Sequence, residues 1–362
     1  MGKTPSSSTH DLGPTMSDDE VKEKYRVERL KRLRPDGINQ FEDFHPDEGQ
    51  LGGSKPSPGN DPIWYMTKWR VLIVRAGFGG LLFAVRLIQK GFCTAEEIKI
   101  VDEGIDFGGA WHWNKFPGLK CDIESYIYLP LLEETGYMPS GKYVGGIEIQ
   151  EHAVRIAKKW NLARQTSFGT SVTDLVDFVY LATELLHTPN VPDLEGMDQF
   201  NGKMVHSARW DYIFTGGYRA KPEMIKLKDK RVGIVGTGAT AVQLIPELTK
   251  WAKEAVVFQY TAASVFPRDN EITHAESECM GSGWQRERAE NFNAFLSNDN
   301  SLPEMNLVND EWSKMQSYSA LIGSPSNLEP EYLEETIQKD IEHQKRIRDR
   351  VSHIVHDPET AA

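Results

Sequence analysis

The chain has 362 residues, of which 39% are hydrophobic and 26% are charged, and its formal net charge is −12. These values are typical of a soluble globular protein with room for two domains, and the acidic balance argues against a binder of nucleic acid or of anionic membranes. The three cysteines are far apart, so we expect neither a disulfide scaffold nor a metal site. No apolar run reaches the ~20 residues of a membrane span and no secretory signal is evident, so we expect a cytoplasmic protein.

Residues 1–60 are predicted to form an N-terminal extension. The first 16 residues are rich in Ser, Thr and Pro, which is typical of disorder. Ser17 and Glu20 form a capping-box pattern that opens a charged helix, SDDEVKEKYRVERLKRLR, and Pro35 ends it. The charges favour a solvated helix over one that binds a partner. Residues 47–62 have the composition of a linker.

The first folded unit begins with RVLIV (residues 70–74), an apolar run of the buried-strand type. A glycine turn and the helical pattern LLFAVRLIQKGF follow, and IKIV (residues 98–101) is the next predicted strand, ending at Asp102. The order strand, glycine turn, helix, strand and acid is the first half of a doubly wound nucleotide-binding unit.

The same order recurs. RVGIV (residues 231–235) is a predicted strand, Gly236-Thr237-Gly238 a turn, ATAVQLIPELTKW a helix, and AVVFQ (residues 255–259) the next strand. We therefore expect an α/β fold with two doubly wound, Rossmann-like dinucleotide-binding domains, at residues 61–193 and 194–281. Two such units indicate two nucleotides, and the usual pair is a flavin plus a nicotinamide. Residues 282–362 are predicted to be helical, polar and charged.

Two further segments carry chemical information. Residues 106–128 read DFGGAWHWNKFPGLKCDIESYIY, where Gly and Pro interrupt both the helical and the strand period. Large flat side chains beside glycines suit a backbone that wraps a planar ligand, although a Trp-rich surface loop is the alternative. Phe200, Gly202, His206 and Trp210 form the pattern F-x-G-x-x-x-H-x-x-x-W between the two units. Alone, His206 would be interpreted as a structural histidine.

In this context the pattern resembles the fingerprint of Baeyer–Villiger monooxygenases, flavoenzymes that insert oxygen beside a ketone. The loop GGAWHWNKFPGLKCDIESYIY resembles the flavin-side loop of the same family, and the charged N-terminal helix resembles that of fungal members from terpenoid and meroterpenoid pathways. The resemblance covers residues 17–355.

The resemblance implies binding of FAD and NADPH. Flavin contacts would fall on Gly77, Gly79, Asp102, Ala110, Trp111, His112, Trp113, Asp122 and Tyr128. Contacts to the nicotinamide nucleotide would fall on Lys120, Cys121, Asp122, Gly236, Thr237, Gly238, Ala239, Thr240, Ala241, Val242, Gln243, Tyr260 and Thr261. The resemblance assigns the active-site carboxylate to Asp122 and the coupling of nucleotide binding to domain motion to the fingerprint that contains His206 and Trp210. The substrate would be a terpenoid or meroterpenoid ketone, converted to an ester or lactone.

Three residues depart from the family pattern. Arg75 replaces the first glycine of the first nucleotide turn, where a side chain crowds the phosphate site. Tyr260 stands where family members usually have an arginine that pairs with the 2′-phosphate of NADPH, so we expect a weaker preference for NADPH. Glu184 replaces the glycine of an Ala-Thr-Gly turn and adds negative charge near the phosphates.

Two segments of the family pattern are not found. TSVTDL (residues 170–175) runs directly into VDFVYLAT, whereas the family has a β-meander at this point, so we expect an incomplete flavin domain with exposed apolar sheet. The chain reaches Ala362 in the helical region, where family members continue to a catalytic arginine. The sequence therefore predicts an FAD- and NADPH-dependent monooxygenase of impaired activity. The alternatives are an inactive, truncated remnant, a non-redox scaffold, or a partner for a full-length paralogue.

Overall fold

The structure is a computed structural model. It describes residues 17–32, 35, 41–43, 69–169, 176–184, 186, 188–259, 263–273, 281–297, 302–315 and 330–357. The chain divides into two compact units, and each is described by itself. The smaller unit comprises Met1–Gly37, Ala263–Arg268 and Glu290–Ala362, and the larger comprises Ile38–Ala262 and Asp269–Ala289. Within the described ranges, no helix is both long enough and apolar enough to cross a membrane.

The larger unit contains a four-stranded parallel sheet with the strand order β4-β3-β2-β5. Its strands are β2 (Val71–Val74), β3 (Ile98–Asp102), β4 (Thr166–Phe168) and β5 (Phe178–Leu181). Val71 at the start of β2 lies opposite Ile98 on one side and Phe178 on the other. The central position of the first strand confirms the predicted doubly wound arrangement, because the crossovers extend the sheet on both sides of β2.

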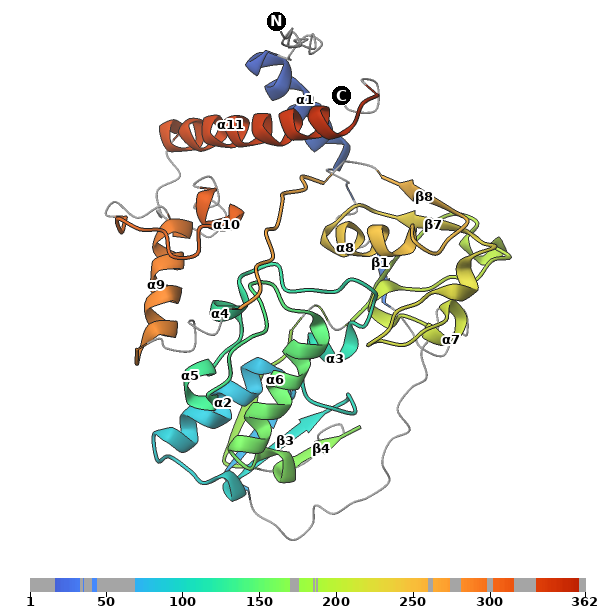
Figure 1. Ribbon diagram of the computed structural model, residues 1–362. Coiled ribbons are helices and arrows are strands. Elements are labelled where there is room, and N and C mark those ends of the chain that lie inside the picture. Colours follow the sequence, from blue (N-terminus) through green and yellow to red (C-terminus); the bar gives the residue numbers. More distant parts are fainter. Residues whose placement is uncertain are drawn as a thin grey trace, which may run out of the picture. The chain divides into compact units, whose positions relative to one another are not determined.

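Helices α2 (Phe78–Gln89) and α6 (Gly146–Lys159) lie side by side in this unit (Figure 1). Both helices and the two central strands contribute to one hydrophobic core. Fully buried members of that core include Ile73, Leu81, Ile98, Ile100 and Ile156. The apolar residues of α2 recur at helical spacing, so one face of the helix is covered by the sheet while Arg86 and Gln89 point outward. The predicted strand–turn–helix–strand unit is confirmed.

The edge strand β5 is only partly covered. Phe178 and Tyr180 lie on the α2 side, where Tyr180 stacks on Phe83 of α2 at a ring distance of 3.8 Å. Side chains alternate along a strand, so Val179 and Leu181 face the other way, and they are 56% and 65% exposed. Exposed apolar sheet was expected in this region, and the loss of a β-meander beside it stays a prediction. Residues 170–175, on which that expectation also rests, lie outside the described residues.

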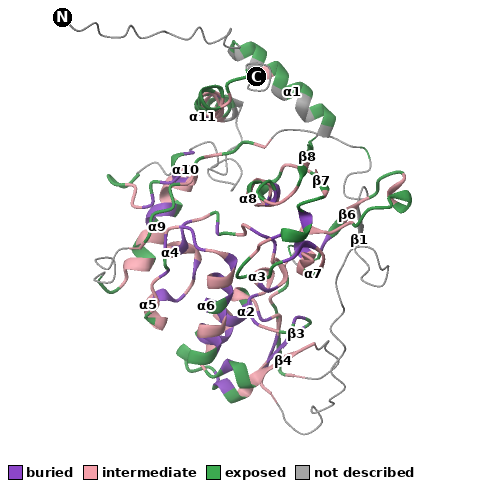
Figure 2. Ribbon diagram, turned by 45° about the vertical axis from the view of Figure 1, so that its right-hand side comes forward, coloured by how far each residue is buried: buried purple, intermediate pink, exposed green. Residues whose placement is uncertain are grey.

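The second nucleotide unit consists of β7 (Arg231–Val235), α8 (Ala239–Leu248) and β8 (Glu254–Phe258), and the two strands pair in parallel. Leu244 and Leu248 of α8 pack with Met224 and Leu227 in a separate small core. Burial is lower here than in the first unit, and Figure 2 shows exposed residues along β7, β8 and α8. The order strand, turn, helix and parallel strand confirms the second predicted unit.

Short elements complete the larger unit. β1 (Phe41–Asp43) pairs antiparallel with β6 (Asn190–Pro192). Among the described residues, single-turn α-helices are α3 (Ala110–Trp113), α4 (Ser125–Tyr128), α5 (Leu132–Thr135) and α7 (Tyr212–Thr215). Described 3-10 turns are η3 (Ala95–Glu97), η4 (Leu162–Gln165), η5 (Met197–Gln199), η6 (Ser207–Arg209) and η7 (Ile225–Leu227).

The described secondary structure of the smaller unit is helical, as predicted for its N- and C-terminal segments. It contains α1 (Asp18–Arg32), α10 (Glu311–Lys314) and α11 (Pro330–Ile354), together with the C-terminal part of α9 (Trp284–Ser297). The capping box at α1 is confirmed, because Glu20 accepts a hydrogen bond from Ser17 N (2.7 Å) and its own N–H donates to Ser17 Oγ (3.3 Å). An exposed ion pair of 2.7 Å joins Lys22 to Glu334. The boundaries of the predicted domains stay predictions.

Candidate nucleotide-binding site

The first nucleotide turn lies between β2 and α2, where two glycines approach each other closely. A Cβ at Gly77 would come within 3.3 Å of the Gly109 Cα, and one at Gly109 within 3.0 Å of the Gly77 Cα. Gly108 N also donates to Ala76 O (3.1 Å). The turn at the N-terminus of α2 and the aromatic loop are therefore packed backbone to backbone, which larger side chains would prevent. Gly79 faces Ala182, with 3.7 Å between its added Cβ and the alanine Cβ.

Asp102, the predicted ribose acid, is buried at the end of β3. Its carboxylate accepts hydrogen bonds from Ala76 N (2.6 Å) and Gly104 N (2.7 Å). The acid therefore ties the first turn to β3 in the protein alone. A carboxylate has about four acceptor positions, so these two bonds leave room for a ribose hydroxyl.

Arg75 adopts a backbone φ of 93°, the left-handed region in which glycine is favoured. Its guanidinium forms an ion pair with Glu103, at 3.1 Å between Nη1 and Oε2. The same nitrogen lies 3.9 Å from Asp102 Oδ1. The backbone of the turn thus keeps the shape expected for a glycine, while the side chain reaches the acids at the end of β3.

The aromatic loop contains two helical turns, α3 and α4, although we expected neither helix nor strand there. The left-handed φ angles of Gly108 (123°) and Gly109 (55°) reverse the chain and start α3. Trp111 Nε1 donates to Tyr128 Oη (2.9 Å), and the two rings meet edge to face at 5.6 Å. Burial raises the pKa of Tyr128 to about 12, so its phenol is neutral near pH 7 and accepts this bond. The predicted flavin residues Trp111 and Tyr128 are brought together.

His112 and Cys121 point into the protein. Burial, with the nearby Lys115 charge, lowers the pKa of His112 to about 4, and burial raises the pKa of the Cys121 thiol to about 12. Gln150 Nε2 lies 3.3 Å from His112 Nδ1. Both side chains are neutral at ordinary pH and hold the loop in place, so any cofactor contact from these two positions would involve backbone atoms.

The second nucleotide turn is open. Gly236 has a φ of 98°, and a Cβ placed on Gly236 or on Gly238 would meet nothing within 4 Å. Gly238 begins α8 without a side-chain cap, and Ala239 after it is exposed. The N-terminus of this ten-residue helix therefore offers backbone N–H groups to a phosphate, as expected for a nucleotide turn. Thr240, Ala241 and Val242 form the first turns of α8. Tyr260 and Thr261 lie outside the described residues.

The structure joins the aromatic loop to the second nucleotide turn. Lys120 N donates to Gln243 Oε1 (3.0 Å), and Gln243 Nε2 donates to Lys120 O (3.3 Å). A Cβ on Gly118 would lie 2.5 Å from Gln243 O, so glycine is needed for this approach. Both residues belong to the nicotinamide set expected from the sequence, and they are 123 positions apart.

The three residues predicted to be catalytic differ in setting. Asp122 is exposed at the end of the Lys120 segment. His206 is half-buried, and its Nδ1 accepts from Ala208 N (3.2 Å) as the cap of η6. Burial lowers the pKa of His206. Trp210 packs against the small core of the second unit, and its Nε1 is buried with no hydrogen-bond partner among the described residues.

Several residues that support the aromatic loop were missed by sequence reasoning. Arg219 donates to Trp111 O (2.8 Å), to Gly146 O (3.1 Å) and to the Gln150 side chain. Arg209 lies over the Trp113 ring, 4.3 Å from its centroid. Arg209 occupies an unspecified position of the Phe200–Trp210 pattern and Arg219 lies outside it, so the pattern gave no signal for either contact.

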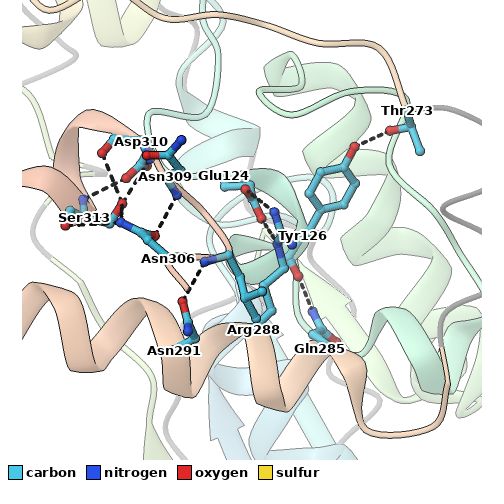
Figure 3. Close-up of polar contacts among 11 residues, drawn as sticks. Glu124, Tyr126, Thr273, Gln285, Arg288, Asn291, Asn306, Asn309, Asp310 and Ser313 are labelled. Atoms are coloured by element: carbon cyan, nitrogen blue, oxygen red, sulfur yellow. Dashed lines mark hydrogen bonds and ion pairs between the residues drawn. The ribbon is translucent and has the colours of Figure 1, made fainter. Parts of the chain in front are cut away.

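A second group of missed contacts anchors the residues after Asp122 (Figure 3). The buried Glu124 carboxylate accepts two hydrogen bonds from Arg288. Gln285 Nε2 donates to Tyr126 O (3.0 Å) and to Leu129 O (2.6 Å), and Tyr126 Oη lies 2.6 Å from Thr273 Oγ1. The first turn of α9 thus holds the second half of the aromatic loop in place.

These residues fit two dinucleotides, with one exception. The open glycine turn before α8 fits a pyrophosphate, and the Gly77–Gly109 contact beside the Trp111–Tyr128 pair fits a nucleotide with a planar ring. Arg75 is the exception, because its side chain lies on the acids that a ribose would contact.

Comparisons with known proteins agree with this geometry. No protein-family model matches the chain. The chain is 42% identical to the FAD-binding monooxygenase ausC of Aspergillus calidoustus, over 94% of this chain and 58% of the relative. It is 46% identical to the FAD-binding monooxygenase trt3 of Aspergillus terreus, over 93% of this chain and 59% of the relative. The chain thus spans less than two thirds of the length of either relative.

Solved structures show the same fold. The polycyclic ketone monooxygenase from the thermophilic fungus Thermothelomyces thermophila superposes with a TM-score of 0.86 at 36% identity, over 95% of this chain and 62% of that structure. OTEMO in complex with FAD and NADP superposes with a TM-score of 0.59 at 24% identity, over 81% of this chain and 59% of that structure, which establishes likeness of fold alone.

Proposed function

Because the chain belongs to the family of fungal FAD-binding monooxygenases of the Baeyer–Villiger type, we propose that it binds FAD and NADPH and acts in the oxidation of a terpenoid or meroterpenoid ketone to an ester or lactone. The chain covers 58% of the length of its relative ausC, so the activity of the whole protein is part of this proposal.

One observation supports the proposal best, namely the reciprocal hydrogen bonds between Lys120 and Gln243. Transfer of a hydride from a nicotinamide to a flavin requires the two rings to be in contact. The link puts the aromatic loop against the helix that begins at the second nucleotide turn. A flavin beside Trp111 and a nicotinamide nucleotide on α8 would then share one border.

The proposal assigns a role to each part of the site. The first turn with Gly77 and Gly79 would hold the FAD pyrophosphate at the N-terminus of α2, and the Trp111–Tyr128 pair would flank the flavin. The turn of Gly236 and Gly238 would hold the NADPH pyrophosphate. When bound, NADPH supplies the hydride and FAD the chemistry that activates oxygen. Asp122, exposed two residues after Lys120, would orient the nicotinamide or hold a proton.

The preference for NADPH over NADH is proposed to be narrow. Tyr260 follows β8 at the position where an arginine would pair with the 2′-phosphate, and a phenol carries no charge for that fork. A cytoplasmic location is a further part of the proposal, and the free thiols of Cys93 and Cys121 support a reducing compartment.

The purified protein tests the proposal directly. It should carry the flavin absorbance band at near one FAD per chain, and it should oxidise NADPH faster when a polycyclic ketone is added. Protein that remains colourless after incubation with FAD contradicts the proposal.

A second candidate function is a non-redox one, in which the chain is an inactive remnant, a scaffold or a partner for a full-length paralogue. Arg75 favours it, because its guanidinium lies on the acids of the first turn. Flavin-free protein that still binds NADPH, or that co-purifies with a full-length paralogue, supports this candidate. Ketone-stimulated NADPH oxidation excludes it.

A further inference from the structure

Arg75 is held in an unfavourable backbone conformation by contacts on both sides of it. At a φ of 93° a residue with a Cβ is strained, and glycine is not. The Arg75 N–H donates to Val101 O (2.7 Å), which attaches the residue to β3. A Cβ on Gly80 would lie 2.2 Å from Arg75 O, so the backbone of α2 packs closely against the Arg75 carbonyl. The fold therefore imposes this φ.

The side chain of Arg75 follows β3 and ends on two carboxylates. Its Nη2 donates a hydrogen bond to Glu103 Oε1 (3.2 Å), and its Nη1 lies 3.1 Å from Glu103 Oε2 as an ion pair. The Asp102 carboxylate is 3.9 Å away. The Arg75 side chain is 17% exposed, whereas Glu103 is 60% exposed. The guanidinium thus lies under Glu103 and beside Asp102.

In a doubly wound unit this position has a defined use. The acid at the end of the second strand accepts a hydrogen bond from the ribose of the dinucleotide, next to the pyrophosphate at the helix N-terminus. In this chain the guanidinium lies beside that acid, with 3.9 Å between Arg75 Nη1 and Asp102 Oδ1. A ribose hydroxyl and the guanidinium would need the same carboxylate oxygens.

We propose that Arg75 is an internal competitor of the dinucleotide, such that the adenosine ribose binds Asp102 only after the guanidinium, held by Glu103, moves away. The inference rests on the proposed binding of a dinucleotide at the first turn. Arg75 then determines how tightly this chain holds its nucleotide, and the ion pair with Glu103 determines how readily the site opens.

The test is an FAD titration, followed by flavin fluorescence, of wild type, Arg75→Gly, Glu103→Gln and Arg86→Gln. Arg86 on α2 forms a similar surface pair with Glu134 (3.1 Å) and serves as the matched control. Arg75→Gly should lower the Kd for FAD by about tenfold, the effect of one charge-assisted pair, and Arg86→Gln should leave it unchanged. The combined Arg75→Gly and Glu103→Gln variant should change the free energy of FAD binding by less than the sum of the two single changes, because both substitutions break the same ion pair.

The nucleotide-free protein gives an independent readout. Arg75→Gly should keep or raise the thermal midpoint, because glycine relieves the strained φ, whereas Arg75→Ala should lower it, because the strain stays and the ion pair is lost. A lower midpoint for Arg75→Gly with an unchanged Kd assigns Arg75 a purely structural role and overturns the proposal. A weaker Kd for Arg75→Gly overturns it too, since Arg75 would then bind the phosphates.

ADP separates this inference from the proposed function. It is titrated in a Gly238→Asp background, where the new carboxylate repels phosphate from α8 and its Cβ meets nothing within 4 Å. Tighter ADP binding by Arg75→Gly supports the inference even if the protein never oxidises NADPH. The inference is overturned if ADP binds equally well, or fails to bind, in the variants with and without Arg75. In that case ketone-stimulated NADPH oxidation by the wild type would still support the proposed function.

Discussion

Arg288 neutralises Glu124, a carboxylate that is completely buried two residues after the exposed Asp122. Both carboxylate oxygens accept hydrogen bonds from the guanidinium, and the two residues are 164 positions apart. The side chain of Arg288 is 21% exposed, so the charge pair is largely removed from water. The contact connects the first turn of α9 to the loop that carries Asp122 (Figure 3).

Replacing Arg288 should therefore be costly. Arg288→Met leaves the Glu124 charge buried without a partner, and the free energy of unfolding should fall by about 3–5 kcal/mol. Arg288→Lys keeps a charge without the fork and should cost less. Urea unfolding measures both. The surface variant Arg86→Met is the control and should cost about 1 kcal/mol or less. If Arg288→Met behaves like this control, Glu124 is not stabilised by the pair.

Gln243 should matter for the nicotinamide nucleotide more than for the flavin. Gln243→Leu removes both hydrogen bonds to the Lys120 backbone, and the cost in stability should be about 1 kcal/mol. The border between the two nucleotide sites would loosen, so the Kd for NADPH should rise about tenfold while the Kd for FAD stays unchanged. Isothermal titration with each nucleotide checks this. Gln199→Leu, at an exposed position of η5, is the control. Equal losses for both nucleotides would contradict the prediction.

His206 combines a local cap with the coupling role expected from its motif. His206→Ala removes the acceptor for Ala208 N and should cost about 1 kcal/mol, whereas His206→Asn retains an acceptor and should cost little. If the imidazole couples nucleotide binding to domain motion, both variants should slow the reduction of bound flavin by NADPH to a similar degree. Anaerobic stopped-flow absorbance measures that rate. A full rate in His206→Asn would restrict His206 to capping.

Stability should decrease as the pH falls from about 6.5 to about 4. Burial lowers the pKa of His112, and burial likewise lowers the pKa of His152, in each case from 6.5 to about 4. In this window the unfolded chain binds protons that the folded chain does not, so the free energy of unfolding rises with pH. The contribution of these two histidines to stability is therefore lost as the pH falls from 6.5 to about 4. Each histidine should contribute on the order of 1–3 kcal/mol across the window.

Urea unfolding at a series of pH values tests this dependence. His112→Gln should flatten the decrease below pH 6.5, because its amide does not titrate, and His152→Gln should do so independently. Curves that stay parallel to the wild type would assign the acid sensitivity to other groups.

Sequence patterns predicted the elements that depend on local periodicity. The runs RVLIV and RVGIV became β2 and β7, and the apolar spacing after each turn became α2 and α8. The capping box of Ser17 and Glu20 also forms as expected, since it needs contacts only three residues apart. The aromatic loop was less predictable, because the two positive φ angles of Gly108 and Gly109 start a helical turn that composition does not reveal.

The sequence by itself determined that two nucleotide turns, an aromatic loop and a linking histidine motif are present, because each is encoded within one short run of neighbouring residues. Only the tertiary structure decided which of these parts meet. Gln243 reaches Lys120, and Arg288 reaches Glu124, across more than a hundred positions of chain. Arg75 shows the physical reason most clearly: a guanidinium can pair with a phosphate or with a carboxylate, and the position of the end of β3, set by packing, selects Glu103.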